Sequence, residues 1–443
     1  MKISSKKDLL KLNFQSFLQK INQLISTKPL IFFILILLIG LYLRFYLIEE
    51  TLYFGYDQGR DAWIVKDIID GKLSLIGPRT GVGNFHLGPI YYYLLAPFYK
   101  ITDLDPMAAN YFSIAVNIFN FSVLFYVTKK IFNNYAALFV VMIYATSEYL
   151  MGSRIPWNVS LMPSISTLIF YSIIKVYEGS YRWILAMWAL SGFYFNIHFT
   201  AIFFPPIIIA SLVFVKDKKK ALKYSLVGIP LYLVWFVPNI IYEFQNSGVQ
   251  YLKIKEFLNN YYIGFHLRFM IYRFSNAFIQ FETIANFPRI IFLKFIIPFT
   301  FFIIAFILSR NKKDKILAYL ISLWFIIPLL GFTLYGGPIS DYYFLFQVPI
   351  VLFIFWYLIE KLLKLKHNII FVLVIFILSF YIYYNTNGLW VKKPTGLSLK
   401  QQKEEVKNLI LKGEKLDNKS DPYFRDKIEP YLYTIWVENG KRW

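Results

Sequence analysis

The sequence contains no cysteine, and only four of its 443 residues are histidine. A chain without cysteine cannot form a disulfide, a thiolate nucleophile or a cysteine-based metal site. Charged residues are also scarce, at 16%, whereas soluble globular domains carry about 25%. This shortage excludes an ordinary soluble domain, and it predicts that the few charges either lie outside a membrane or have a function.

Hydrophobic residues make up 57% of the chain, and they gather in long runs. The first run, 29–48, has about 20 residues, which is enough to cross a bilayer core. A cleavable signal peptide would have a shorter apolar core, so we expect this run to be a permanent span. The sequence predicts eleven spans in all, at 29–48, 108–128, 136–151, 159–175, 183–198, 199–215, 222–240, 289–309, 316–335, 343–362 and 368–386.

The formal net charge of +21 is explained by membrane topology, and we expect no nucleic-acid partner. Lysine and arginine gather between the apolar runs, as the positive-inside rule expects of cytoplasmic loops. The segment 87–101 contains Pro89 and Pro97 and is short for a span, so we expect it to lie partly inserted without crossing. Every basic cluster then falls on the cytoplasmic side: 1–28, 129–130, 175–182, 216–223, 310–315 and 361–367.

The opposite, extracytoplasmic side collects the loops 50–86 and 241–288 and a short C-terminal tail, 387–443. We divide the chain into a transmembrane domain that includes both loops, 1–386, and this tail. The 241–288 loop is longer than ordinary connections, which favours a functional role. Its mixture of aromatic and basic residues predicts a helix that lies at the membrane interface.

The first loop carries the motif YFGYDQGRDAW, which places Asp57, Arg60 and Asp61 in an aromatic setting. Asp57 is a favoured residue for the N-cap of a helix that runs to Ile69, with Gly71 beyond its end. Spacings of three and four residues also put the three charged groups on one side of that helix. A carboxylate held beside an arginine where little water enters can accept a proton from a hydroxyl, so Asp57 is also a candidate general base. The two interpretations are compatible.

Other polar residues of the extracytoplasmic side include His86, Arg154 and His198. Each of them alone is more typical of a structural hydrogen bond than of catalysis. Together they supply donors on one face of the membrane, which suit an anionic phosphate. No apolar run has a charged residue near its middle, although coupled transporters usually need one. This pattern favours a site at the membrane surface.

The chain resembles the polytopic GT-C glycosyltransferases, in the group that includes protein O-mannosyltransferases, lipid A aminoarabinose transferases and related bacterial enzymes of the family 39 or RgtA-like type. The resemblance covers roughly 30–390 and rests on the ordered segments YDQGRDA, FHLGPIYYYLLAPFY, SRIPWNVSLMP, NIHFTAIFFPP, PNIIYEFQNSG and DYYFLFQVP. It implies an all-α polytopic membrane protein with about 11 transmembrane helices (range 11–13) and extracytoplasmic juxtamembrane helices.

The resemblance also implies roles for individual residues. Asp57 matches the first-loop aspartate that acts as catalytic base, and His86 falls at the motif that opens the next helix, where this chain has HLGP in place of HPPL. Tyr56 and Gln58 flank Asp57, so the acidic pair of metal-using oligosaccharyltransferases is missing, and we expect no metal or other cofactor. The residues expected to bind substrate or phosphate are Arg60, Asp61, His86, Arg154, Asn158, His198, Glu243, Arg268, Arg273 and Tyr342.

The implied reaction transfers a sugar from a polyprenyl-phosphate donor to an acceptor hydroxyl, with inversion, at the extracytoplasmic face of the plasma membrane. The implied partners are this lipid-linked donor, the bilayer, and a glycan, lipid or protein acceptor. Two alternatives from other classes stay open. A flippase for polyprenyl-linked glycans would carry polar residues or repeats at the membrane midplane, and a non-catalytic assembly protein would not need an aspartate and basic groups on one face.

Overall fold

The computed structural model describes residues 19–20, 22–52, 54–285, 293–365, 367–387, 398–412 and 424–441. Within these ranges the chain is almost entirely helical, and its strand-like pairings are two isolated β-bridges, Arg79 with His86 and Tyr262 with Tyr335. The predicted all-α fold is therefore confirmed.

Each predicted span corresponds to an apolar helix, although the start of the run 289–309 lies outside the described residues. In the described part of the chain, six helices are long and apolar enough to cross a membrane, and five more are apolar but shorter. The long ones are α6 (Ala108–Ile131), η2 with α8 (Asn158–Tyr177), α11 with η4 and α12 (Lys218–Gln245), α17 (Lys312–Thr333), η6 with α18 (Asp341–Leu363) and α19 (Asn368–Thr386). The shorter ones are α2 (Pro29–Phe45), α7 (Asn134–Thr146), α9 (Trp183–Phe195), η3 with α10 (Phe199–Ser211) and α16 with η5 (Leu293–Leu308).

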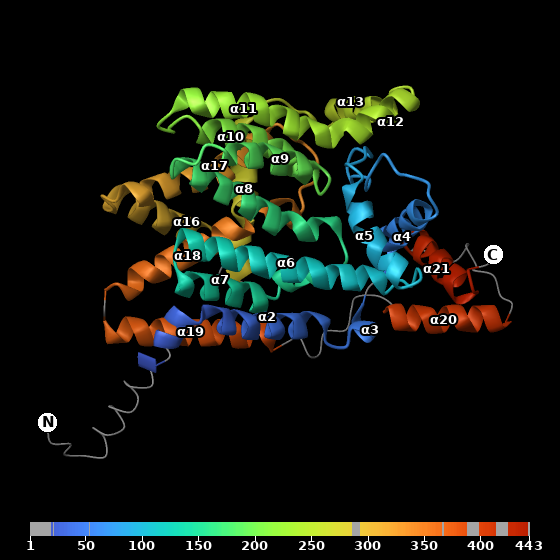
Figure 1. The fold of residues 1–443 in the computed structure, drawn as a ribbon, viewed down its shortest axis with the longest axis horizontal. Coiled ribbons are helices and arrows are strands. Elements are labelled where there is room, and N and C mark those ends of the chain that lie inside the picture. The colour runs from blue at the N-terminus through green and yellow to red at the C-terminus, as the bar shows by residue number, and fades with distance from the viewer. Residues whose placement is uncertain are drawn as a thin grey trace, which may run out of the picture.

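The helices between the first two spans do not run with the bundle. They are α3 (Ile48–Thr51), α4 (Tyr56–Ile69) and α5 (Ile90–Ile101), and in Figure 1 α4 and α5 lie at the right-hand ends of the long helices and run across their direction. Helix α5 has 12 residues, which is about 18 Å of helix, whereas a bilayer core is about 30 Å thick. Because α5 also runs across the direction of the long helices, the segment 87–101 does not cross the bundle, as predicted.

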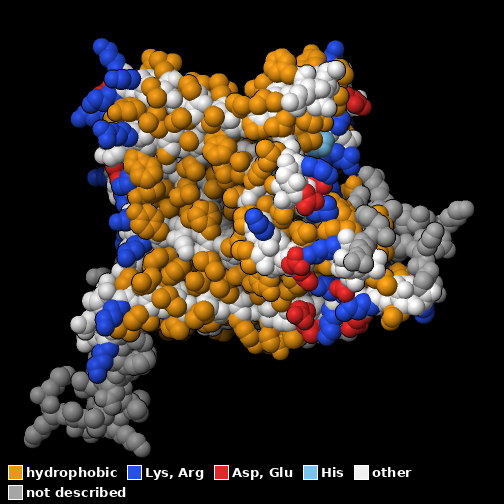
Figure 2. All heavy atoms as spheres, turned by 45° about the vertical axis from the view of Figure 1, so that its right-hand side comes forward, with side chains coloured by type: hydrophobic (Ala, Val, Ile, Leu, Met, Phe, Trp, Pro, Cys, Tyr) orange, Lys and Arg blue, Asp and Glu red, His pale blue; other side chains and the backbone are white. Residues whose placement is uncertain are grey.

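The basic clusters gather at the opposite end of the bundle. Lys129 and Lys130 close α6, Lys218 opens α11 and Lys312 opens α17. Figure 2 shows Lys and Arg side chains along the left edge, an apolar band in the middle, and a right-hand side where acidic and basic residues mix. This distribution separates a basic end of the bundle from the end where α4 and α5 lie.

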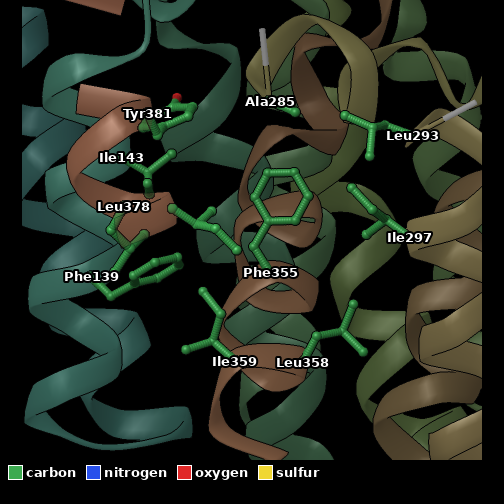
Figure 3. Close-up of a pocket in the computed structure, with 11 residues that line it drawn as sticks. Phe139, Ile143, Ala285, Leu293, Ile297, Phe355, Leu358, Ile359, Leu378 and Tyr381 are labelled. Atoms are coloured by element: carbon green, nitrogen blue, oxygen red, sulfur yellow. The ribbon is translucent and has the colours of Figure 1, made fainter. Parts of the chain in front are cut away.

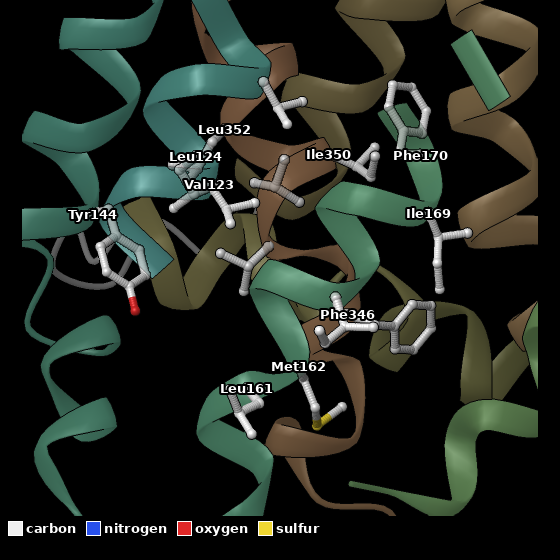
Figure 4. Close-up of a cluster of buried hydrophobic side chains, with 14 of the residues drawn as sticks. Val123, Leu124, Tyr144, Leu161, Met162, Ile169, Phe170, Phe346, Ile350 and Leu352 are labelled. Atoms are coloured by element: carbon white, nitrogen blue, oxygen red, sulfur yellow. The ribbon is translucent and has the colours of Figure 1, made fainter. Parts of the chain in front are cut away.

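The core that joins the spans lies where α6, α8 (Met162–Tyr177) and α18 (Val348–Leu363) meet (Figure 4). Leu124, Phe170 and Ile350, one from each of these helices, are fully buried. Lipid tails are as apolar as these side chains, so close packing and interhelical hydrogen bonds must hold such helices together.

Buried polar side chains provide those hydrogen bonds. Asn120 of α6 donates to the Tyr144 hydroxyl at 3.0 Å and to the Ser160 carbonyl oxygen at 2.9 Å. Arg44, fully buried near the end of α2, donates to the carbonyl oxygens of Tyr144 at 2.6 Å and Ala145 at 3.0 Å. The last carbonyls of a helix have no partner within it. Arg44 therefore caps α7 and fixes α2 against it.

The 241–288 loop is largely helical where it is described, up to residue 285. It contains the end of α12 (Val237–Gln245), then α13 (Val249–Tyr261), α14 (Leu267–Ala277) and α15 (Ile279–Ala285). Leu258 and Ile271 of this loop expose 51% and 69% of their surface. The predicted interfacial stretch is thus two helices, α13 and α14, that carry exposed apolar side chains.

The C-terminal tail contributes α20 (Leu399–Lys412) and α21 (Phe424–Glu438). Figure 1 shows both at the end of the bundle where α3 and α4 lie, and α20 contacts α3 while α21 contacts α4. The C-terminal tail therefore packs against the first loop.

Candidate functional site

Helix α4 begins directly after Gly55 and carries the charged motif in its first turns. Gly55 has the extended backbone of an N-cap, and its N–H donates to Gln58 Oε1 at 3.0 Å. The prediction that Asp57 is the N-cap is wrong because Asp57 is already helical, in a first turn where a negative charge is still favourable. The predicted end at Ile69 is confirmed, and Gly71 beyond it has a left-handed φ of 89°.

Arg60 lies between two aspartates of this helix. Its Nη1 donates to Asp57 Oδ1 at 2.8 Å, while Nε and Nη2 donate to Asp61 Oδ1 at 2.9 and 2.6 Å. The Asp57 side chain is 43% exposed and that of Asp61 only 2%. The three charged groups therefore lie on one side of α4, as their spacing predicts, with one accessible carboxylate beside an arginine that a buried carboxylate anchors.

Burial decides the protonation of this group of charges. It raises the pKa of Asp61 to about 6, against the opposing charge of Arg60. Burial also lowers the pKa of Arg60, but the two carboxylates outweigh that effect and raise it above its ordinary value. The arginine therefore stays charged, while Asp61 takes up a proton below neutral pH.

A cavity of about 200 Å³ lies where the segment 149–163 meets Asp341, Tyr342 and Leu345, and none of its lining residues belongs to α4. Gln58 donates to the carbonyl oxygen of Pro156 at 3.0 Å, which ties α4 to the segment that forms one wall. Trp157 and Tyr342 lie with ring centroids 4.8 Å apart at this cavity, and the Asp57 carboxylate interacts electrostatically with Tyr342. The lining residues are Tyr144, Tyr149, Leu150, Gly152, Ser153, Ile155, Trp157, Val159, Ser160, Pro163, Asp341, Tyr342 and Leu345.

Arg154 lies in the wall segment, between the cavity residues Ser153 and Ile155. It is half-buried, and its Nη2 donates to the carbonyl oxygen of Thr51 at 2.6 Å. A guanidinium has five N–H donors, so this bond to the backbone leaves capacity for an anion.

Asn158 and His198 are buried beside the same wall. Asn158 donates to the carbonyl oxygen of Ile197. The backbone N–H of Thr200 donates to Nδ1 of His198 at 3.3 Å, and the Thr200 hydroxyl lies 2.9 Å from the same nitrogen. The His198 ring lies 5.8 Å from that of Tyr342. Thr200 therefore fixes the orientation of the His198 ring.

His86 lies four residues before α5 begins and joins the two extracytoplasmic loops. The backbone N–H of His86 donates to Gln250 Oε1 at 2.9 Å, and the Nε2 of Gln250 lies 2.9 Å from the ring Nδ1 of His86. Burial lowers the pKa of His86 to about 4, and the charges of Lys253 and Arg79 contribute. His86 is thus neutral at neutral pH and links the 50–86 loop to α13.

The remaining predicted residues, Glu243, Arg268 and Arg273, lie in the second loop. Glu243 accepts hydrogen bonds from two N–H groups at the start of α13 at 2.9 and 2.8 Å. Arg273 is buried and donates to the carbonyl oxygen of Gly337 at 2.8 Å, and Arg268 is exposed on α14. Among the described residues, no hydrogen bond or ion pair joins these three to the charges of α4.

Two cavity residues, Trp157 and Tyr149, were not predicted as site residues from the sequence. Trp157 lies between the candidates Arg154 and Asn158, but tryptophan is also common at membrane interfaces for reasons unrelated to chemistry. The Tyr149 hydroxyl accepts a hydrogen bond from Gln280 Nε2 at 3.2 Å, and residues 131 positions apart give no local signal.

A second cavity, also of about 200 Å³, lies among α7, α16, α18 and α19 (Figure 3). It is lined by Phe139, Ile143, Ala285, Leu293, Ile297, Phe355, Leu358, Ile359, Ile377, Leu378 and Tyr381. None of these lining residues carries a charge, and we assign no chemistry to it.

The arrangement of the helices matches that of solved structures. The crystal structure of ArnT from Cupriavidus metallidurans bound to undecaprenyl phosphate matches this chain with a TM-score of 0.55 and 11% identity. The match covers 91% of this chain and 75% of that chain. This chain has the GT-C glycosyltransferase fold.

Two structures of the Archaeoglobus fulgidus oligosaccharyltransferase share the GT-C fold. One is a complex with Zn and sulfate, with a TM-score of 0.55 and 12% identity over 89% of this chain and 57% of that chain. The other, named AglB, is a complex with an inhibitory peptide and a dolichol-phosphate, with a TM-score of 0.54 and 10% identity over 93% and 60%. This chain thus spans less than two thirds of the oligosaccharyltransferase.

The sequence itself gives a narrower match. Residues 86–242 match the family described as dolichyl-phosphate-mannose-protein mannosyltransferase, which is less than half of the chain. No curated protein sequence matches the chain. The predicted resemblance to GT-C glycosyltransferases is confirmed by this family match together with the fold.

Proposed function

We propose that this protein is a membrane glycosyltransferase that transfers a sugar from a polyprenyl-phosphate donor to an acceptor hydroxyl. The observation that carries this proposal is the exposed Asp57 carboxylate, held by Arg60 and acting electrostatically on Tyr342 of an aromatic-lined cavity in a GT-C fold. ArnT and AglB, which have this fold, have been seen with undecaprenyl phosphate and dolichol-phosphate. Residues 1–386 form the transferase domain, and 387–443 form its C-terminal tail.

In the proposed reaction Asp57 acts as the general base. It takes the proton of the acceptor hydroxyl, whose oxygen forms a bond to the anomeric carbon of the donor sugar. The bond from that carbon to the phosphate oxygen breaks, its electron pair leaves with the polyprenyl phosphate, and the configuration inverts. Arg60 orients the carboxylate, and Asp61 anchors Arg60 from the buried side.

The leaving phosphate needs positive charge and hydrogen-bond donors as its negative charge grows. We assign the charge to Arg154, which lies in the chain between the lining residues Ser153 and Ile155 and has further N–H donors besides the one bonded to Thr51. We assign His198 a donor role through Nε2, because its Nδ1 accepts from the Thr200 N–H, while Trp157 and Tyr342 offer ring faces to the sugar. Arg268 extends the basic surface on the second loop.

Other predicted residues act through the walls of the site. Asn158 holds the wall segment against the turn at Ile197. His86 and Glu243 shape the start of α13, and Arg273 fixes α14 to the turn at Gly337. These residues position the second loop beside the first.

Purified protein supplied with a polyprenyl-phosphate sugar tests the function directly. We expect free polyprenyl phosphate and a glycosylated acceptor, both measured by mass spectrometry, and the lipid that copurifies with the protein would indicate the donor. A flippase would move the donor across vesicle membranes with its sugar still attached. An assembly protein would do neither, and either result would contradict the proposal.

The proposed site faces outward, because the basic ends of the helices mark the cytoplasmic side. Single cysteines in this cysteine-free chain test this orientation. Exposed positions suit the test, and Gly81 in the first loop, Asn259 in α13 and Lys219 in the basic cluster are all exposed. In intact cells we expect a membrane-impermeant thiol reagent to label the first two and not the third. If Gly81→Cys reacted and Asn259→Cys did not, the two loops would lie on opposite faces and could not share a site.

Metal removal should not affect the transfer reaction. No group of three or more His, Cys, Asp and Glu side chains that could hold a metal occurs in the parts of the chain that the structure describes. We therefore expect EDTA treatment to leave the rate of transfer unchanged within about twofold. Loss of activity that Mn²⁺ or Mg²⁺ restores would contradict this expectation.

A further inference from the structure

The C-terminal helix α21 packs against α4, the helix that carries Asp57 (Figure 1). The Trp63 ring of α4 lies edge-on to Tyr433, with centroids 5.0 Å apart, and 5.4 Å from Trp436. The Lys66 Nζ lies 5.3 Å from the centre of the Trp436 ring. At about 100° per residue, Trp63 and Lys66 face away from Asp57. The C-terminal tail therefore packs against the face of α4 that points away from Asp57.

Tyr433 is the centre of this contact. It is fully buried, and its ring packs against Phe54 at 6.1 Å and edge-on to Tyr99 of α5 at 6.2 Å. Its hydroxyl donates to the Leu104 carbonyl oxygen at 2.8 Å. One side chain of the tail thus joins α4, α5 and the turn that leads to α6.

Helix α20 attaches the same tail to the first loop a second time. The Leu399 N–H donates to the Leu52 carbonyl oxygen at 2.8 Å, and Lys403 pairs with Asp105 at 2.8 Å. Leu399 is buried, whereas the ion pair is partly exposed and contributes little. The backbone bond and the buried aromatic cluster are therefore the main attachments.

We infer that the C-terminal segment is a positioning element of the site, which holds α4 so that Asp57 stays aligned with the cavity. Helix α4 has 14 residues, and isolated helices shorter than about 12–15 residues are marginal in water. The side of α4 that carries Asp57, Arg60 and Asp61 is charged. Its orientation therefore depends on apolar packing against the opposite side, where Trp63 contacts Tyr433. Tyr433 and Trp436 do not contact the reacting atoms; they act through α4. This inference rests on the proposed function.

Three variants test the inference with two readouts. Tyr433→Ala removes the ring, Tyr433→Phe keeps the ring and loses the bond to Leu104, and Leu411→Ala alters a residue of α20 that is 84% exposed. We expect Tyr433→Ala to lower kcat about 10- to 100-fold, since a displacement of about 1 Å can cost 10²-fold, with little change in the KM for the donor. Tyr433→Phe should restore most of kcat, and Leu411→Ala should match the wild type.

Hydrogen exchange of the α4 amides reports the position of the helix independently of activity. We expect faster exchange in Tyr433→Ala and wild-type exchange in Leu411→Ala. Unchanged exchange in Tyr433→Ala overturns the inference, whether or not activity is lost, and so does an equal loss of kcat in Leu411→Ala. If the wild type transfers no sugar but Tyr433→Ala still loosens α4, the proposed function fails while the supporting role of the tail stands.

Discussion

Asp57→Asn is expected to lower kcat for sugar transfer by about 10²- to 10⁴-fold, the usual contribution of a general base. The amide has nearly the same shape as the carboxylate, and its oxygen can still accept from Arg60 Nη1, which lies 2.8 Å from Asp57 Oδ1. It cannot take the proton of the acceptor. Initial rates at saturating donor measure the effect, and binding of the lipid-linked donor should be retained because the cavity is unchanged.

Asp67→Asn is the matched control for this variant. Asp67 lies on the same helix, its side chain is 49% exposed, and it pairs with Lys72 at 3.3 Å. The same chemical change there should leave kcat within about twofold, because exposed ion pairs contribute little. Full activity in Asp57→Asn would remove Asp57 as the base, and equal losses in the two variants would point to a general effect of charge on α4.

Arg60→Met is expected to have the second largest effect, on activity and on stability. It leaves the Asp61 carboxyl, 2% exposed, without its ionic partner, and removal of one member of a buried pair typically costs about 3–5 kcal/mol. Asp57 also loses the group that orients it, so we expect kcat to fall about 10²-fold. Thermal unfolding in detergent and initial rates measure the two effects.

Two further variants separate the geometry of Arg60 from its charge. Arg60→Lys keeps the charge but cannot donate to both carboxylates in a fixed plane, so it should recover part of the stability and little of kcat. Lys72→Met removes a positive charge from a side chain that is 73% exposed and should behave as the wild type. A fully active Arg60→Lys would contradict the orienting role.

The arrangement of charges on α4 could be predicted because it is local. Residues three and four apart on a helix face each other wherever that helix lies, and Arg60 indeed contacts both Asp57 and Asp61. The N-cap was assigned wrongly for a local reason as well. Aspartate and glycine are both accepted at that position, and the choice of Gly55 depends on the hydrogen bond from its N–H to Gln58 and on the bond from Gln58 to Pro156, 98 residues away.

The cavity lined by Trp157 and Tyr342 could not be predicted from local spacing. Its two aromatic rings come from Trp157 and Tyr342, and their positions follow from how η2 and η6 pack at the end of the bundle. The bond between His86 and Gln250 joins residues 164 positions apart. Aromatic and polar residues are common in every extracytoplasmic loop of this chain, so composition alone did not indicate which of them meet.

The sequence by itself determined the membrane class, the positions of the apolar runs, the non-spanning segment 87–101 and the basic end of the bundle. These features follow from the length of apolar runs and the cost of burying charge, and neither depends on what the helices contact. Only the tertiary structure decided which candidate residues share the cavity, and that the C-terminal helix supports α4 through Tyr433. The physical reason is that such contacts arise from packing between segments far apart in the chain, and packing selects among many residues of the same type.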